Sequence, residues 1–286
     1  MNRINLMVPF KADGVDLLAN AYVVGFPSMT GVAGGMHQIE RKIKEIAPGL
    51  INKFECFSLV LDKCELKEGH PRIINYMKAK RSSGVTPPTT LDKKTGAVSG
   101  YLLATIDCKD DVNVTTLIEV ADRAIQNVRF CGGMIFTKGG FSAYHELKDA
   151  LAAMKSTSPL FVVEDMSELL TDKKERVDLM LKLLSRPKNI EKTAFIFKDE
   201  NYGYLSPTSI GYVLLEEPNK KACVRNDFLH AYAEPQIGLV RLRTIGSTLL
   251  ALRAAENDPD FLAPAILWNY EKITTENQTQ LIVRSI

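Results

Sequence analysis

Apolar and polar residues along the first 140 positions form the patterns of strands and helices in turn. Short apolar runs rich in β-branched and aromatic residues are typical of strands. Between these runs, apolar positions recur at helical spacing over residues 32–46 and 115–127, and Ser28 or Thr30 is placed to cap the first helix. The predicted strands are residues 3–10, 54–61 and 98–106, with a further strand or turn at 129–136.

The order of these elements is strand, helix, strand, then strand, helix, strand. This order predicts an α/β (α+β) fold of ferredoxin-like type, a modified RNA-recognition-motif domain. We place this domain at residues 1–142, with a basic arm at 67–97. Helical patterns over 144–154 and 163–184 indicate an additional helical lobe at 143–192.

Residues 193–286 read as C-terminal strands and a helix that complete the fold. Strands are predicted at 193–197, 210–215 and 237–242, and a helix at 247–255. A short helix is expected over 261–270. Pro9 is expected to place the end of the first strand near a sheet edge.

Charge is nearly balanced over the chain but not along it. The 36 Lys and Arg against 34 Asp and Glu leave a net charge of +2, while the stretch 67–94 is strongly basic. Lys78, Lys80 and Arg81 lie in this stretch, which also contains Pro, Gly and Ser. Such clustering favours contact with a nucleic-acid backbone, either RNA or an incoming duplex, and the alternative is a solvated loop.

Composition and cysteine usage place the chain among globular cytoplasmic proteins. Hydrophobic residues make up 45% of the 286 residues, which excludes disorder over the whole chain. No apolar run is long enough for a signal peptide or a transmembrane helix, so no membrane partner is expected. The five cysteines are widely spaced, as expected for reduced thiols.

Motifs for catalysis, cofactors or metals are not found in the sequence. There is no GxGxxG or GxxxxGK[ST] loop, and the four histidines lack metal-ligand spacing. The acidic pair Glu164-Asp165 reads as solvated surface. We therefore predict no catalytic residue, no metal and no cofactor. The alternatives left open are a small-molecule α/β enzyme that uses Cys131 or Ser142 and an RNA-binding scaffold of unrelated function.

Several residues instead suit RNA. Tyr202 and Tyr204 flank a glycine and could stack on splayed bases, although they could equally lie partly buried in a turn. Gly132 and Gly133 would let a phosphate approach the backbone beside the guanidinium of Arg129, and the alternative there is a bulge at a strand end.

Three motifs resemble a family of CRISPR proteins. Residues 25–28 read Gly-Phe-Pro-Ser and are followed by Gly34, His37 and Arg41, similar to the GFPS…G..H…R signature of RAMP subunits of type I-F complexes, of the Csy-two or Cas-five type. Residues 129–135 are similar to the family's R-x-x-GG-x-I, and 203–207 are similar to GY.ALSP. The chain is shorter than the family leads one to expect, and 237–243 carries arginines in place of Glu-Trp, which fits a divergent or minimal variant.

The resemblance implies a non-catalytic subunit of a CRISPR type I-F interference complex (Cascade). Such a subunit would cap the 5′ handle of the crRNA and would contact the backbone RAMP subunit and, where present, the large subunit. Target double-stranded DNA near the protospacer-adjacent motif (PAM) is a further partner that the resemblance implies.

Physical reasoning gives the first motif a role in binding RNA. Amides at the start of the helix, with the hydroxyls of Ser28 and Thr30, can hold a phosphate. His37 and Arg41 are four residues apart and share one helix face. Gly34 is expected to let the helix pack closely on the sheet or another backbone, and the alternative for His37 is a satisfied core histidine.

Overall fold

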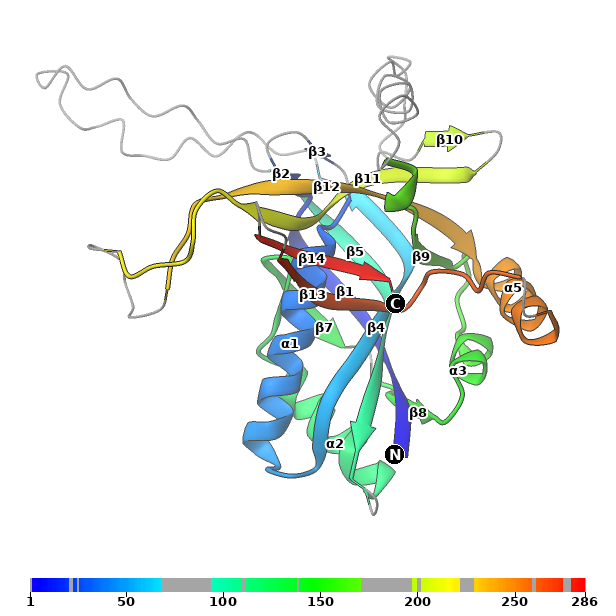
Figure 1. Ribbon diagram of the computed structural model, residues 1–286. Helices are drawn as coiled ribbons and strands as arrows, with labels where there is room; N and C mark the ends of the chain where they lie inside the picture. The colour runs from blue at the N-terminus through cyan, green and yellow to red at the C-terminus, as the bar shows by residue number, and fades with distance from the viewer. Residues whose placement is uncertain are drawn as a thin grey trace, which may run out of the picture.

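The first half of the chain folds as the sequence order predicts (Figure 1). In the computed structural model, β1 (Asn2–Asp16), α1 (Met29–Ile46), β4 (Ile51–Leu66), β5 (Thr95–Cys108), α2 (Val114–Ile125) and β7 (Gly133–Thr137) follow one another. The strands lie in the order β4-β5-β1-β7, and all neighbours are antiparallel. This is the strand order of a ferredoxin-like sheet, and the mixed α+β fold is confirmed.

The structure describes most of the chain. The described residues are 2–20, 23–24, 26–67, 94–109, 112–137, 139–170, 197–199, 202–221, 229–258, 261–274 and 279–285. The remaining elements are β2 (Leu18–Asn20), β3 (Val23–Val24), β6 (Arg129–Phe130), β8 (Ser142–Tyr144), α3 (Leu147–Ala153), β9 (Phe161–Asp165), the 3₁₀ turn η3 (Ser167–Leu170), β10 (Phe197–Asp199), β11 (Gly203–Leu214), β12 (Ala233–Thr244), α5 (Ile245–Asn257), β13 (Trp268–Thr274) and β14 (Thr279–Ser285).

The C-terminal strands extend the ferredoxin sheet from its β4 edge. The order continues from β4 through β9, β12, β11 and β14 to β13. Trp268 of β13 pairs with Phe57 of β4, so these six strands form a closed circuit. Trp268 is fully buried, and its Nε1 donates to the carbonyl oxygen of Val163 at 3.0 Å. The C-terminal strands are therefore joined to the first half of the chain at both ends of the circuit.

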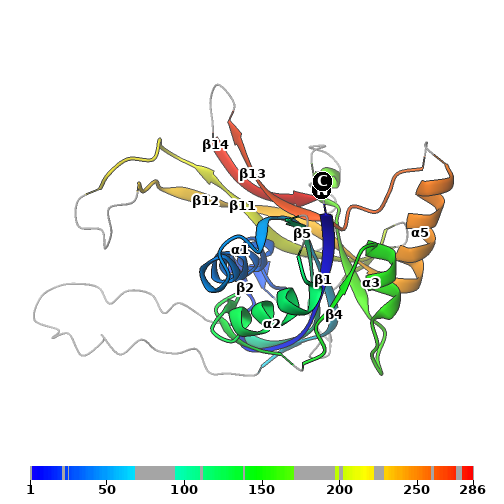
Figure 2. The same cartoon turned by 90° about the horizontal axis from the view of Figure 1, so that it is seen from below.

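Helices cover both faces of the ferredoxin sheet (Figure 2). On one face, α1 and α2 bury the apolar stripes that the sequence places at helical spacing, including Val32, Ile39 and Leu117. On the other face, α3 and α5 pack against Met7 of β1 and Leu103 of β5. Among the described helices, none combines the length and apolar character needed to cross a membrane.

Three predictions about secondary structure are wrong. The first strand was expected to end near Pro9, but β1 continues past it to Asp16. Pro9 lies between the residues of β1 that pair with β8 and those that pair with β7. The helix predicted from residue 163 is replaced there by β9 and η3, because Val162 and Val163 are buried in the sheet. The short helix over 261–270 is absent, and β13 begins at Trp268. Residues 171–196 lie outside the described part, and the division into three regions stays a prediction.

Candidate nucleic-acid interface

Helix α1 begins where the sequence predicts a cap. Ser28 is the N-cap, and its Oγ accepts from the Gly31 amide at 3.0 Å. The Ser28 carbonyl oxygen accepts from the amide of Val32 and from the thiol of Cys131, the latter at 3.6 Å. Gly25, the first residue of the motif, lies outside the described residues.

The first two sequence motifs and the strand that carries the third meet at this helix entry. Cys131 belongs to the second motif and contacts Ser28, as above. From the strand that carries the third motif, the Oγ1 of Thr208 donates to the carbonyl oxygen of Pro27 at 2.8 Å, and Thr208 is fully buried. Residues about 100 and 180 positions away along the chain therefore fix the start of α1.

The turn of the second motif is stabilised by contacts within the protein. Cys131 and Gly132 both have positive φ, 44° and 80°. The Nη1 of the exposed Arg129 donates to the carbonyl oxygen of Gly132 at 3.1 Å. A Cβ on Gly133 would lie 2.7 Å from the backbone of Asp13, so that position requires glycine. This geometry is that of a tight turn between β6 and β7, and a phosphate contact at Arg129 stays a prediction.

One stripe along α1 faces solvent. Thr30, Gly34, His37 and Arg41 follow one another at i, i+4, i+7 and i+11, a length of about 16 Å along the helix. Thr30 is half-buried and the other three are exposed. The His37 side chain is 68% exposed, with its Nδ1 3.6 Å from Glu40 Oε2. The alternative of a core histidine is therefore wrong.

The expected packing role of Gly34 is also wrong. A Cβ on Gly34 would meet no atom within 4 Å. The glycines that α1 packs through are Gly31, whose Cβ would lie 2.9 Å from Cys131 Sγ, and Gly35, at 3.3 Å from the Arg129 carbonyl oxygen. Gly34 instead leaves a bare patch of backbone on the exposed stripe.

The two tyrosines do not join this stripe. Tyr202 packs against the small apolar cluster of Leu205 and Leu239. Tyr204 is 44% exposed, and its ring meets Phe161 edge-on at 6.4 Å. It lies four residues along β11 from Thr208, or roughly 13 Å from the helix entry. Lys78, Lys80 and Arg81 lie outside the described residues.

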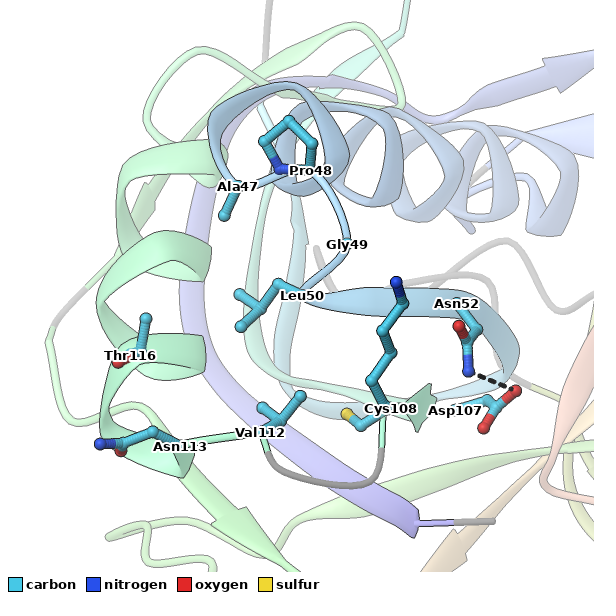
Figure 3. Close-up of a pocket in the computed structure, with 11 residues that line it drawn as sticks. Ala47, Pro48, Gly49, Leu50, Asn52, Asp107, Cys108, Val112, Asn113 and Thr116 are labelled. Carbon is cyan, nitrogen blue, oxygen red and sulfur yellow. Dashed lines mark hydrogen bonds between the residues drawn. The ribbon is translucent and has the colours of Figure 1, made fainter.

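A cavity of about 900 Å³ opens at the other end of α1 (Figure 3). Its lining includes Asp107, Cys108 and Asn113, and Asn52 Nδ2 donates to Asp107 Oδ2 at 3.3 Å. Burial, and then the charge of Asp107, raises the pKa of the Cys108 thiol to about 11. A protonated thiol is a poor nucleophile, so the cavity offers little for covalent chemistry.

The two nucleophiles of the enzyme alternative have unsuitable surroundings. Burial, and then the charge of Asp16, raises the pKa of the Cys131 thiol far above its usual range. Ser142 Oγ donates to the Gly140 carbonyl oxygen at 3.4 Å, which does not activate it. In the described ranges, no group of three His, Cys, Asp or Glu side chains could hold a metal ion.

Sequence reasoning missed a charged cluster on β9 and β12. Glu164, interpreted as solvated, is 4% exposed and pairs in register with Arg241. Arg241 binds it through two nitrogens at 2.7 and 2.8 Å, and Arg243 approaches it at 3.4 Å. The sequence feature that could have revealed this cluster is the Arg-x-Arg spacing, because residues two apart in a strand lie on the same sheet face.

The comparison with protein families agrees with the three motifs. The model of the family described as CRISPR-associated protein (Cas_Csy2) matches residues 10–279. This match includes the entry to α1, the β6–β7 turn and strands β11 and β12. No curated protein matches the chain.

Proposed function

Because this chain belongs to the CRISPR-associated Csy2 family and is therefore a subunit of the type I-F Cascade complex, we propose that it binds and caps the 5′ handle of the crRNA through α1. The exposed stripe of Thr30, Gly34, His37 and Arg41 contacts the RNA backbone. The subunit also contacts the backbone RAMP subunit and, where present, the large subunit. It is a Cas-five-type RAMP protein of a minimal variant, and it binds RNA without cleaving it.

The observation that carries this proposal is an exposed glycine, Gly34, on the helix face that runs from the capped start of α1 to the basic side chains of His37 and Arg41. Glycine within a helix costs up to about 1 kcal/mol relative to alanine, and no neighbour within the described residues requires it at position 34. Bare backbone there admits a close approach by a ribose or a phosphate. Arg41, one turn beyond His37, has no ion-pair partner among the described residues, so its guanidinium can bind a phosphate with two parallel hydrogen bonds.

The first test is Arg41→Ala in the assembled complex. Removing a charge-assisted hydrogen bond costs ~1.5–3 kcal/mol, so crRNA affinity should fall roughly 10- to 150-fold, measured by filter binding at fixed salt. The free energy of unfolding should change by no more than about 0.5 kcal/mol because the side chain is exposed.

Arg123→Ala provides the matched control, since Arg123 is an exposed arginine on another surface helix, α2. It should leave crRNA affinity unchanged. If the Arg41→Ala protein is stable and assembles with crRNA at wild-type affinity, α1 is not part of the RNA interface.

The basic arm at 67–97 is proposed to lie along a nucleic-acid backbone, that of the crRNA or of target DNA near the PAM. Its support is the charge of the sequence. Replacing Lys78, Lys80 and Arg81 together by alanine should flatten the dependence of log affinity on log salt by about one unit for each phosphate that the arm no longer binds. If the slope of log affinity against log salt is unchanged, the arm does not bind phosphates and is a solvated loop.

A further inference from the structure

A partly buried cluster of charged side chains lies on β9 and β12 next to the start of α5, away from the α1 stripe. Glu164 is the centre of the cluster, with its side chain 5% exposed. Arg241 and Arg243, the arginine pair, both approach it, and each arginine side chain is 22% exposed. One carboxylate faces two guanidinium groups, so the cluster carries an excess of one positive charge.

The hydrogen bonds fix both guanidinium groups and leave part of each unused. Arg241 uses Nε and Nη2 on Glu164. Arg243 uses Nη1 on Glu164 and Nε on Ser247 Oγ, the latter at 3.3 Å. The remaining terminal nitrogens, Nη1 of Arg241 and Nη2 of Arg243, have no partner in the described part of the chain and are not among its buried unpaired atoms.

This arrangement is what recognition of an anion requires. Held in place by a buried carboxylate, the guanidinium groups lose little further freedom when a ligand arrives. Two residues apart on one strand, the arginines have Cα atoms roughly 7 Å apart, and both lean toward Glu164. A phosphate has two non-bridging oxygens, and each can accept from one open nitrogen. The bound anion would also relieve the repulsion between the two arginines.

We propose that the arginine pair binds a phosphate of nucleic acid, as a second contact point on the face of the sheet that carries α3 and α5. The inference rests on the proposed function, because membership of a Cascade complex makes nucleic acid the nearest source of such an anion. The phosphate belongs either to the crRNA or to the target DNA duplex.

The test replaces Arg243 by glutamine in the assembled complex and measures two affinities, for crRNA and for target duplex. Arg243→Gln leaves the Arg241–Glu164 pair in place, so the fold is kept. One of the two affinities should fall about tenfold, and its salt slope should fall by about one unit. Whichever affinity falls identifies the source of the phosphate.

Two controls accompany this variant. Arg284→Gln removes another strand arginine paired to a glutamate, at 2.5 Å from Glu271 and with both side chains about half exposed, and should change neither affinity. In the wild-type complex, an arginine-specific dicarbonyl reagent should label Arg243 less when the ligand is bound, and this readout does not depend on a variant folding.

Wild-type affinities and salt slopes for both ligands, with labelling of Arg243 unprotected, would overturn the inference. Loss of a neighbouring subunit without loss of nucleic acid would also overturn it, in favour of a protein carboxylate as the ligand. Arg41→Ala, measured in parallel, separates the two proposals, because either variant can keep wild-type affinity while the other loses it.

Discussion

At the scale of single residues, exposure separates side chains that build α1 from those that are available to a ligand. Gly31, Gly34 and Gly35 are close in sequence, but only Gly31 and Gly35 pack against the rest of the chain. His37 and Arg41 are exposed on the same side as Gly34. The sequence places these residues on one face through helical spacing, while the burial of each follows from how α1 lies on the sheet.

The glycines therefore make a matched pair of variants. Gly34→Ala should raise the free energy of unfolding by up to about 1 kcal/mol, because alanine favours helix and the new methyl group meets nothing. Gly31→Ala should lower it by about 1–3 kcal/mol, because the Cβ would lie 2.7 Å from Ser28 Oγ and 2.9 Å from Cys131 Sγ. Urea unfolding measures both values.

If the RNA backbone approaches α1 at Gly34, the stabilised Gly34→Ala protein should also bind crRNA more weakly. Equal affinity to wild type would mean that the bare backbone at this position is not used. Destabilisation by Gly34→Ala, in contrast, would show that the patch is covered.

At the scale of elements, the pairing of β9 with β12 depends on a charged pair within the sheet. Arg241 lies directly opposite Glu164, and both are largely removed from solvent. Removing one partner of such a pair leaves a buried charge uncompensated, whereas a pair between two exposed side chains contributes little.

Arg241→Ala should therefore lower the free energy of unfolding by about 3–5 kcal/mol. Arg284→Ala is the control, because the side chains of Arg284 and its partner Glu271 are 51% and 43% exposed, and it should cost at most about 1 kcal/mol. Chemical denaturation of both variants tests the difference. Equal costs would mean that Arg243 replaces Arg241 as the partner of Glu164.

At the scale of the whole molecule, Trp268 joins the C-terminal strands to the ferredoxin sheet. It is the only tryptophan in the sequence, it is fully buried, and it pairs with β4 while its indole binds β9. The last strands of the chain are thereby tied to strands from its first and middle parts.

Trp268→Ala should lower the free energy of unfolding by about 3–5 kcal/mol through loss of a large core side chain. Trp268→Phe keeps most of the volume and should cost about 1–3 kcal/mol, because the Val163 carbonyl oxygen loses its donor. Circular dichroism can follow both. A Trp268→Ala protein that unfolds in two steps, with the first half unchanged, would show that the two parts are separately stable.

Local patterns in the sequence were enough to predict most of the helices and strands and the order in which they follow one another. Apolar spacing placed α1 and α2, and Ser28 or Thr30 marked the start of α1, because these features depend on neighbours a few residues away. The strand–helix order in turn predicted the ferredoxin-like sheet. The three motifs also pointed to the family that the comparison found.

Which side chains are buried and which distant residues meet became known only from the folded chain. It put Val163 in a strand although its neighbours have helical spacing, because β9 pairs with β4 on one side and with β12 on the other. It brought Pro27, Cys131 and Thr208 together, buried Glu164 beside two arginines, and left His37 in solvent. These outcomes depend on contacts between residues 70 or more positions apart or on the face that α1 turns to the sheet, and local sequence patterns carry no record of either.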